Sequence, residues 1–188
     1  MSTTQPIRDI NHVRALTNYH LQLGQYRNHQ LIVFGLNTAL RIGDILPICW
    51  QDVYDFCGRS ARSNLVVKEQ KTGKTKTVAL NHKVAQALAL TASAANPQDF
   101  LFANPHSKQP LTRVQARRII CAAGEALRLP VGISCHSLRK TFGYHAWKTG
   151  VSPAVLMEIF NHSSLRHTRR YLGIAQDDLD AVYMGLGW

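Results

Sequence analysis

The chain has 188 residues, of which 45% are hydrophobic, and its formal net charge is +11. This length fits one domain or at most two small ones, and the hydrophobic content excludes a disordered chain. Neither a membrane span nor a secretion signal is indicated, so we expect a cytoplasmic protein. The charge indicates a polyanionic partner, with nucleic acid first, although charge alone does not distinguish this from a merely soluble basic protein.

Motifs for metals and nucleotides are absent from the sequence. The four cysteines form no Cys-x-x-Cys pair, and the nine histidines form no His-x-x-x-His or His-Glu-x-x-His pattern. We therefore expect reduced thiols and no metal site. Glycine-rich phosphate loops are missing too, which argues against nucleotide hydrolysis and predicts that no cofactor is needed.

Two helices are expected first along the chain. Residues 7–23 have apolar side chains at helical spacing and end at Gly24, and Asn28 can cap the next helix, which is apolar on nearly all sides. That helix should be central to the core, and it leads into Arg41. A guanidinium so close to a core needs an anion, which is either Asp44 in a structural salt bridge or an external group such as phosphate.

A lysine-rich β-hairpin is expected next. An extended region should begin at Trp50, and residues 64–70 and 75–80 resemble two strands joined by a turn at Lys71–Lys74. The hairpin is either an ordinary solvated loop or a set of ammonium groups that contact phosphates.

The second half of the chain is predicted to be helical. Helices should cover residues 81–95, begin at Thr112, begin near Cys135, follow Ser152-Pro153 and end near Asn161, with further helices at 164–172 and 177–186. The predicted fold class is thus mainly α with a small antiparallel β-hairpin. His136 and Arg139 share one helix face, and with His162 and Tyr171 they suggest phosphate chemistry.

Four blocks of residues together resemble the tyrosine recombinases, or phage integrase family. They are Thr38–Asp44, Lys71–Lys74, His136–Phe142 and Asn161–Ser164, with Tyr171 nine residues after His162. The order of the blocks and this last spacing match the family, and the resemblance covers about residues 7–174. It implies the catalytic-domain fold of that family, and site-specific cutting and rejoining of DNA strands without metal or ATP.

The resemblance also implies a role for each residue. Tyr171 would be the nucleophile that forms a 3′-phosphotyrosine, and Lys71 would protonate the leaving 5′ oxygen from a mobile hairpin. Two arginines suit the phosphate because each binds two oxygens and stays charged. The complete expected set is Arg41, Lys71, His136, Arg139, His162 and Tyr171, with Asp44 orienting Arg41, His136 assisting proton removal or orienting the site, and His162 donating to phosphate.

Several alternatives stay open for these positions. Tyr183, Tyr144 and Tyr54 compete with Tyr171, and Lys74 competes with Lys71. Asn161 stands where the family usually has glycine, and both residues accept a left-handed turn, so we expect a small effect. His145 and His167 are expected to be surface or packing residues. The expected DNA contacts come from Lys68, Lys74, Lys76, Lys140, Arg169 and Arg170.

The expected partners are a double-stranded DNA recombination site, other protomers in a tetramer on DNA, and accessory DNA-bending proteins. A topoisomerase of type IB and a regulator that binds DNA without cutting are the alternatives, and the kind of mobile element or invertible switch stays open. We expect one catalytic domain over 1–188, with a leader at 1–6 and no separate N-terminal core-binding domain. Such a domain, whether excised or naturally short, should bind DNA more weakly, and with a stronger dependence on salt, than a protein with both domains around the DNA. Residues 175–188 are either exchanged between protomers or an ordinary terminal helix.

Overall fold

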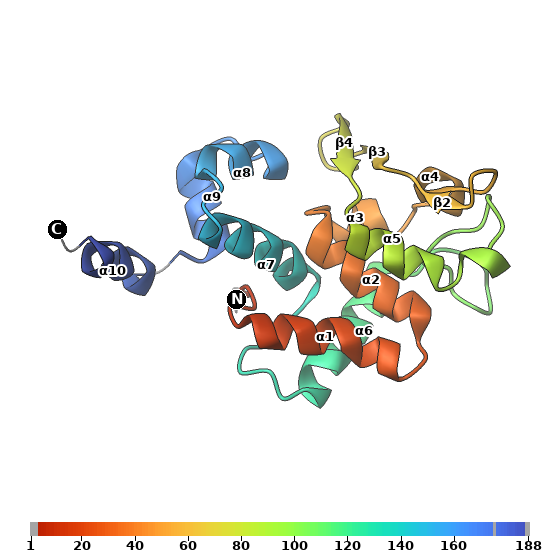
Figure 1. The fold of residues 1–188 in the computed structure, drawn as a ribbon, viewed down its shortest axis with the longest axis horizontal. Helices are drawn as coiled ribbons and strands as arrows, with labels where there is room; N and C mark the ends of the chain where they lie inside the picture. Colours follow the sequence, from red (N-terminus) through yellow and green to blue (C-terminus); the bar gives the residue numbers. More distant parts are fainter. Residues whose placement is uncertain (1–3, 175, 187–188) are drawn as a thin grey trace.

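A computed structural model describes residues 4–174 and 176–186, and it is mostly helical with two small antiparallel sheets (Figure 1). The predicted fold class is therefore confirmed. The α-helices are α1 (Ile10–Gln22), α2 (Tyr26–Asn37), α3 (Ile42–Ile45), α4 (Trp50–Val53), α5 (His82–Ala89), α6 (Arg113–Ala126), α7 (Cys135–Lys148), α8 (Pro153–Phe160), α9 (Leu165–Leu172) and α10 (Gln176–Gly185). The strands are β1 (Tyr54–Asp55), β2 (Ser60–Ala61), β3 (Asn64–Lys68) and β4 (Thr75–Ala79), and Ala92–Ala94 forms a 3-10 turn.

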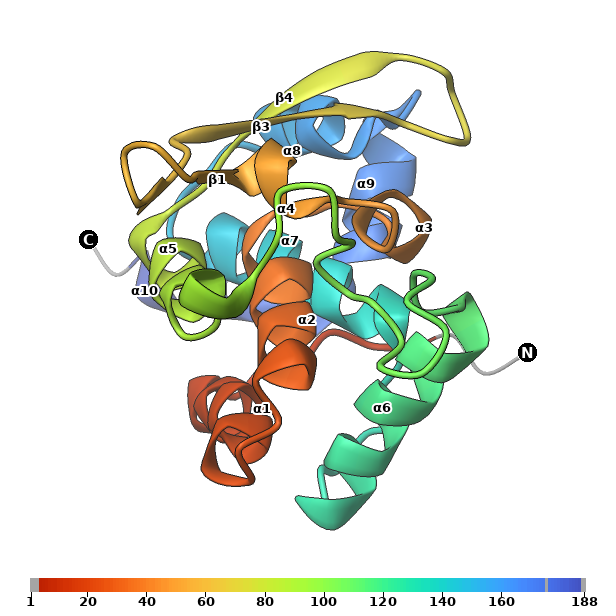
Figure 2. The ribbon, with the colours of Figure 1, turned by 90° about the vertical axis from the view of Figure 1, so that its right-hand side faces the viewer.

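Helix α2 is the centre of the domain, as its sequence predicts. It packs against α1, α5 and α7, which surround it in Figure 2. Its residues from His29 to Leu36 are all buried, since apolar side chains occupy nearly every side. The chain leaves this helix and reaches Arg41 two residues after Ala39, so the buried helix fixes the starting point of the site.

The lysine-rich hairpin is formed by β3 and β4, as predicted. Asn64 pairs with Ala79 and Lys68 pairs with Thr75, which leaves the turn at residues 69–74. Side chains alternate along β3, so Leu65 and Val67 face the core while their neighbours face solvent. A second sheet, formed by β1 and β2, was not predicted because each strand has only two residues.

Three local predictions were wrong. Asn28 lies inside α2 instead of capping it, and the helix begins at Tyr26. The segment from Trp50 forms α4 instead of an extended region, because the Asp52 carboxylate accepts from the backbone N–H of Cys49 at 2.8 Å and caps it. Helix α5 ends at Ala89, and the 3-10 turn replaces the last predicted turns.

Both ends of the described chain contact α7. Of the predicted leader, residues 1–3 lie outside the described residues, while Pro6 is buried and the Thr4 carbonyl accepts from Lys140 Nζ at 2.6 Å. On α10, Asp178 forms ion pairs with Arg8 (3.7 Å) and Lys148 (3.5 Å). Residues 175, 187 and 188 of the predicted C-terminal segment lie outside the described residues. In the described part of the chain no helix is long and apolar enough to cross a membrane.

Candidate active site

The two predicted phosphate-binding arginines meet at one backbone carbonyl. Arg139 Nη2 donates to the Phe160 carbonyl at 2.9 Å, and Arg41 Nη2 donates to the same oxygen at 3.5 Å. Arg139 is buried, at 3% exposure, and its Nη1 also donates to the Ala39 carbonyl at 2.5 Å. Ala39 has φ 55°, a conformation that is strained for a residue with a Cβ and that is found at functional sites. Backbone carbonyls from two distant segments therefore hold the guanidinium of Arg139 in place.

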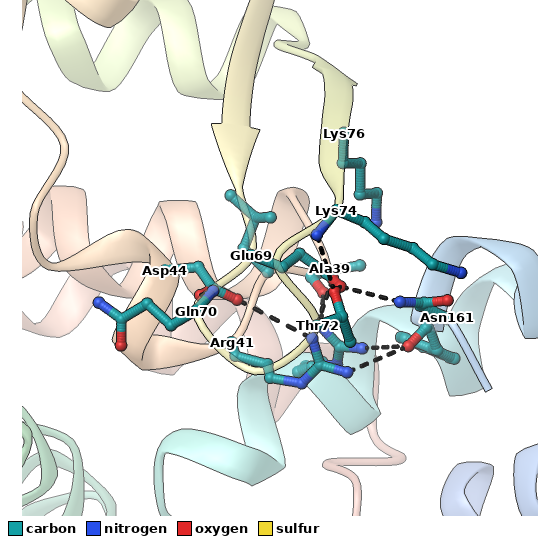
Figure 3. A network of polar contacts seen from close by, with 12 residues as sticks. Ala39, Arg41, Asp44, Glu69, Gln70, Thr72, Lys74, Lys76 and Asn161 are labelled. Atoms are coloured by element: carbon teal, nitrogen blue, oxygen red, sulfur yellow. Dashed lines mark hydrogen bonds and ion pairs between the residues drawn. The ribbon is translucent and has the colours of Figure 1, made fainter.

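The anion partner of Arg41 is Glu69. Its carboxylate accepts from Arg41 Nη1 at 2.9 Å, whereas the Asp44 carboxylate lies 4.0 Å from the same atom (Figure 3). Asp44 is buried, and its Oδ1 accepts from the backbone N–H of Gln70 at 2.9 Å. Asp44, which we expected to orient Arg41, makes the longer of the two ion pairs with it, and Glu69 makes the shorter one. Asp44 also anchors the hairpin, and sequence reasoning missed Glu69.

Four of the six predicted catalytic residues line one cavity of about 470 Å³. Arg41 comes from the segment after α2, Lys71 from the hairpin turn, and His136 and Arg139 from α7. The Lys71 side chain is exposed at the cavity wall. Arg113, at the start of α6, lines the same cavity and was not predicted. Four segments that are distant in sequence therefore bring basic side chains to one cavity.

The other two residues, His162 and Tyr171, lie next to this cavity around the ring of Phe160. The Arg139 guanidinium stands 4.9 Å from the centre of that ring. The rings of His162 and Tyr171 lie 5.3 and 5.2 Å from it, and 5.0 Å from each other. Phe160 thus connects the predicted nucleophile to the predicted phosphate ligands.

Burial shapes the acidity of the predicted proton-transfer groups. Burial raises the pKa of the Tyr171 phenol, and the charge of Arg139 opposes this rise. Partial desolvation and the charges of Lys140, Arg139 and Arg41 lower the pKa of His136. At neutral pH the phenol therefore keeps its proton, while His136 is neutral and able to accept one.

The imidazole of His162 is fixed by Thr168. Its Nδ1 lies 3.1 Å from Oγ1 of Thr168, which is completely buried and also lies 3.3 Å from the Ser164 carbonyl. This hydroxyl has a single proton, which it donates either to the Ser164 carbonyl or, at the shorter distance, to Nδ1. When it donates to Nδ1, the proton of the neutral ring sits on Nε2 and is available to a phosphate oxygen. The exposed ring of His167 stacks on this imidazole, with ring centres 4.3 Å apart. Thr168 was missed by sequence reasoning.

We expect Thr168→Val to slow DNA cleavage about fivefold, because a hydrogen bond that selects the tautomer contributes about 1 kcal/mol. Valine keeps the shape of the side chain, so DNA binding should not change. Single-turnover cleavage of a DNA site measures the effect. Thr168→Ser keeps the hydroxyl and is the matched control, so equal rates for the serine and valine variants would contradict this role.

We expect the His162 imidazole to titrate near pH 4 in the free protein. Burial, then the charge of His167 and of the nearby arginines, lowers its pKa from 6.5 to about 4. Because the unfolded chain binds this proton at higher pH, the free energy of unfolding should fall as pH drops from about 6.5 to 4. An NMR titration of His162 checks the midpoint, and His167→Ala should raise it. A midpoint at or above 6.5 would contradict the burial of this ring.

Some of the residues predicted to contact DNA are exposed, and others are hydrogen-bonded within the protein. Lys68, Lys74, Arg169 and Arg170 are exposed. Lys76 Nζ, in contrast, donates to the Ile159 carbonyl at 2.5 Å, and Lys140 Nζ donates to Thr4 and lies 5.3 Å from the centre of the Tyr171 ring. Both ammonium groups are thus engaged within the protein, and their contact with DNA stays a prediction.

Two further expectations concern histidine and metal. His145 Nε2 bonds the Ile7 carbonyl at 2.9 Å, which confirms a packing role. Among residues 4–174 and 176–186, no cluster of three or more His, Cys, Asp or Glu side chains is placed to hold a metal ion.

Asn161 does more than tolerate a left-handed turn. It ends α8 with φ 51° and ψ 50°, as predicted. Its Nδ2 also donates to Glu69 Oε2 at 3.0 Å. A glycine at this position would supply the turn but not this bond, so the expectation of a small effect covers only the backbone.

Comparison with known proteins gives one consistent result. The sequence profile described as "Phage integrase family" matches residues 8–177. A probable integrase/recombinase of Bacillus subtilis strain 168, YoeC, is 35% identical over 187 residues, which covers 100% of this chain and 99% of that protein. Other relatives named tyrosine recombinases are longer, and this chain spans 31–57% of their length.

Solved structures agree with this at the level of fold. The crystal structure of XerA recombinase matches with a TM-score of 0.77 at 20% identity, over 97% of this chain and 66% of that one. The post-cleavage complex of XerH with its difH substrate matches with a TM-score of 0.76 at 17% identity, over 97% of this chain and 53% of that one.

Proposed function

Because the chain belongs to the phage integrase family and is a tyrosine recombinase, we propose that Tyr171 is the nucleophile with which it cuts and rejoins DNA strands at specific sites. One observation carries this assignment. Arg41, Lys71, His136 and Arg139 line a single cavity, and the Tyr171 ring lies beside the Phe160 ring that Arg139 contacts. A metal-free phosphate site needs this concentration of fixed positive charge next to a nucleophile.

The cleavage step begins with the scissile phosphate bound in the cavity. The guanidinium groups of Arg41 and Arg139 hold its non-bridging oxygens, and neutral His162 donates a further hydrogen bond from Nε2. These donors are held in place before DNA binds, since backbone carbonyls and Glu69 fix the two arginines. Charge that develops on the phosphate is therefore stabilised without rearrangement of the site.

The bond changes then balance within the site. The Tyr171 oxygen forms a bond to phosphorus while the bond from phosphorus to the 5′ oxygen breaks. His136, which is neutral at pH 7, takes the phenol proton, and the Lys71 ammonium donates a proton to the leaving 5′ oxygen. The product is a 3′-phosphotyrosine and a free 5′ hydroxyl. A 5′ hydroxyl from a partner strand reverses these steps, so neither ATP nor metal is required.

The enzyme's partners are a double-stranded DNA site and further copies of the chain, assembled as a tetramer, with accessory DNA-bending proteins at some sites. Helix α10 supports such an assembly, because Val182, Tyr183 and Met184 on it are exposed. Apolar side chains left uncovered at the end of a chain mark a contact surface. In this proposal α10 packs against a neighbouring protomer on DNA.

One trapping experiment tests the proposed function against two others, a type IB topoisomerase and a regulator that binds DNA without cutting it. A nicked DNA site that loses its 5′ fragment after cleavage traps the covalent adduct on a denaturing gel. We expect the wild-type chain to form this adduct in excess EDTA and to join the trapped strand to an added partner strand. An adduct without partner joining would favour a type IB topoisomerase, and binding without any adduct would favour a non-cutting regulator.

A further inference from the structure

Glu69 is a buried acid at the base of the lysine-rich turn. Its side chain is only 1% exposed, and its two oxygens accept hydrogen bonds from three separate segments. Arg41 Nη1 donates at 2.9 Å from the segment after α2, and Thr72 Oγ1 donates at 2.7 Å from the turn itself. Asn161 Nδ2 donates at 3.0 Å from the residue before His162 (Figure 3). One carboxylate thus joins the three segments that carry Arg41, Lys71 and His162.

The residue after Glu69 is anchored as well. The backbone N–H of Gln70 donates to Asp44 Oδ1 at 2.9 Å, and Gln70 Oε1 accepts from Arg113 Nη2 at 2.9 Å. Gly73 adds a backbone bond to the Glu69 carbonyl at 2.8 Å. The backbone on both sides of Lys71 is therefore fixed, while the Lys71 side chain lines the cavity.

The carboxylate stays ionised in spite of its burial. Burial alone would raise the pKa of Glu69, but hydrogen bonds from Thr72 and Asn161 and the charges of Arg41 and Lys76 hold it below its ordinary value. An ionised acceptor forms stronger hydrogen bonds than a neutral one, so all three donors are held firmly at neutral pH.

We infer that Glu69 is a positioning residue for the leaving-group proton transfer, because its carboxylate holds the turn that carries Lys71 in fixed register with Arg41 and His162. The inference rests on the proposed function, in which Lys71 protonates the 5′ oxygen. The hydrogen bond from Thr72 positions Lys71, and the hydrogen bond from Asn161 positions His162. An ion pair between Arg41 and Glu69 alone would need neither of these two hydrogen bonds.

The test separates proton donation from phosphate binding. In a DNA site whose leaving 5′ oxygen is replaced by sulfur, the leaving thiolate needs no proton, so defects that act through Lys71 disappear. We expect Glu69→Gln to slow cleavage of ordinary DNA about tenfold or more, as loss of hydrogen bonds to a charged group does. The deficit should be several-fold smaller with the sulfur-bridged DNA.

Thr72→Val removes the side-chain hydrogen bond between the hairpin turn and Glu69, and it keeps the test valid if Glu69→Gln fails to fold. We expect it to slow cleavage of ordinary DNA about fivefold and to cleave sulfur-bridged DNA like the wild type. Thr77→Val, which removes an exposed hydroxyl of β4, is the matched control and should change neither rate.

Equal deficits on the two substrates would overturn the inference, because Glu69 would then act on phosphate binding or on folding alone. A wild-type chain that forms no adduct with either substrate would overturn the proposed function as well. The two failures are therefore distinguishable by the wild-type reaction.

Discussion

Replacing Tyr171 with phenylalanine is expected to abolish covalent capture of DNA and to leave DNA binding within about twofold of the wild type. Phenylalanine lacks the oxygen that forms the bond to phosphorus, so no other step can replace it. The ring contacts with Phe160 and His162 are retained, because they involve the aromatic carbons that both side chains share. Removing the hydroxyl also changes the free energy of unfolding by only about 1 kcal/mol.

The measurement is a gel assay for the protein–DNA adduct beside a gel-shift assay for binding. Tyr26→Phe is the matched control, since Tyr26 is 42% exposed at the start of α2 and should be dispensable for cleavage. An adduct formed by the Tyr171 variant at the wild-type rate would assign the nucleophile to another side chain.

Replacing Arg139 with alanine is expected to lower the cleavage rate by about 100-fold to 1,000-fold, which is the loss typical of one preorganised oxyanion donor. The variant loses a guanidinium that the Ala39 and Phe160 carbonyls hold at the centre of the site. The buried Ala39 carbonyl would lose this donor, while the Phe160 carbonyl would keep only its longer bond from Arg41, so the free energy of unfolding should fall by about 1–3 kcal/mol.

Arg139→Lys separates charge from geometry. Lysine keeps one positive charge but cannot donate to two carbonyls and to phosphate from one planar group, so we expect most of the loss to remain. Arg118→Ala, which removes an exposed arginine of α6, is the control for net charge and should cleave normally. Thermal unfolding of each variant tests folding separately, and near-normal cleavage by folded Arg139→Ala would contradict the assignment.

The order of the motifs was enough to predict which residues the fold brings together, because each lies in a segment with a strong local signal. Arg41 follows a helix that is apolar on all sides, and Arg139 lies one turn after the start of another helix. Neither signal shows which backbone carbonyl a guanidinium will meet. The shared bond of both arginines to Phe160 depends on how α2, α7 and α8 pack.

Glu69 shows what the sequence contained but did not make obvious. The alternation that buries Leu65 and Val67 in β3 places Glu69 on the same inward face two residues later. A single acid in a lysine-rich hairpin and on a buried face needs a cationic partner. That argument would have identified Glu69 as a partner for Arg41, in preference to Asp44.

Other contacts of the site could not be predicted from the sequence. Lys76 and Lys140 carry charges that composition alone assigns to the surface, yet long side chains reach backbone carbonyls nearby. Thr168 is one of many threonines in the sequence, and only the fold places its hydroxyl against the ring of His162. These contacts form only when distant segments pack together, so periodicity and motif spacing do not reveal them.

The most direct test of the central claim is to map the amino acid that carries the DNA. The trapped adduct, digested with nuclease, trypsin and a protease that cuts before aspartate, gives a separate peptide for each candidate tyrosine. Lys148 lies between Tyr144 and Tyr171, and Asp177, Asp178 and Asp180 lie between Tyr171 and Tyr183. Mass spectrometry should find the nucleotide linked through phosphate to the peptide that contains Tyr171. A nucleotide on the peptide of Tyr183, Tyr144 or Tyr54, or the absence of any adduct, would contradict the assignment.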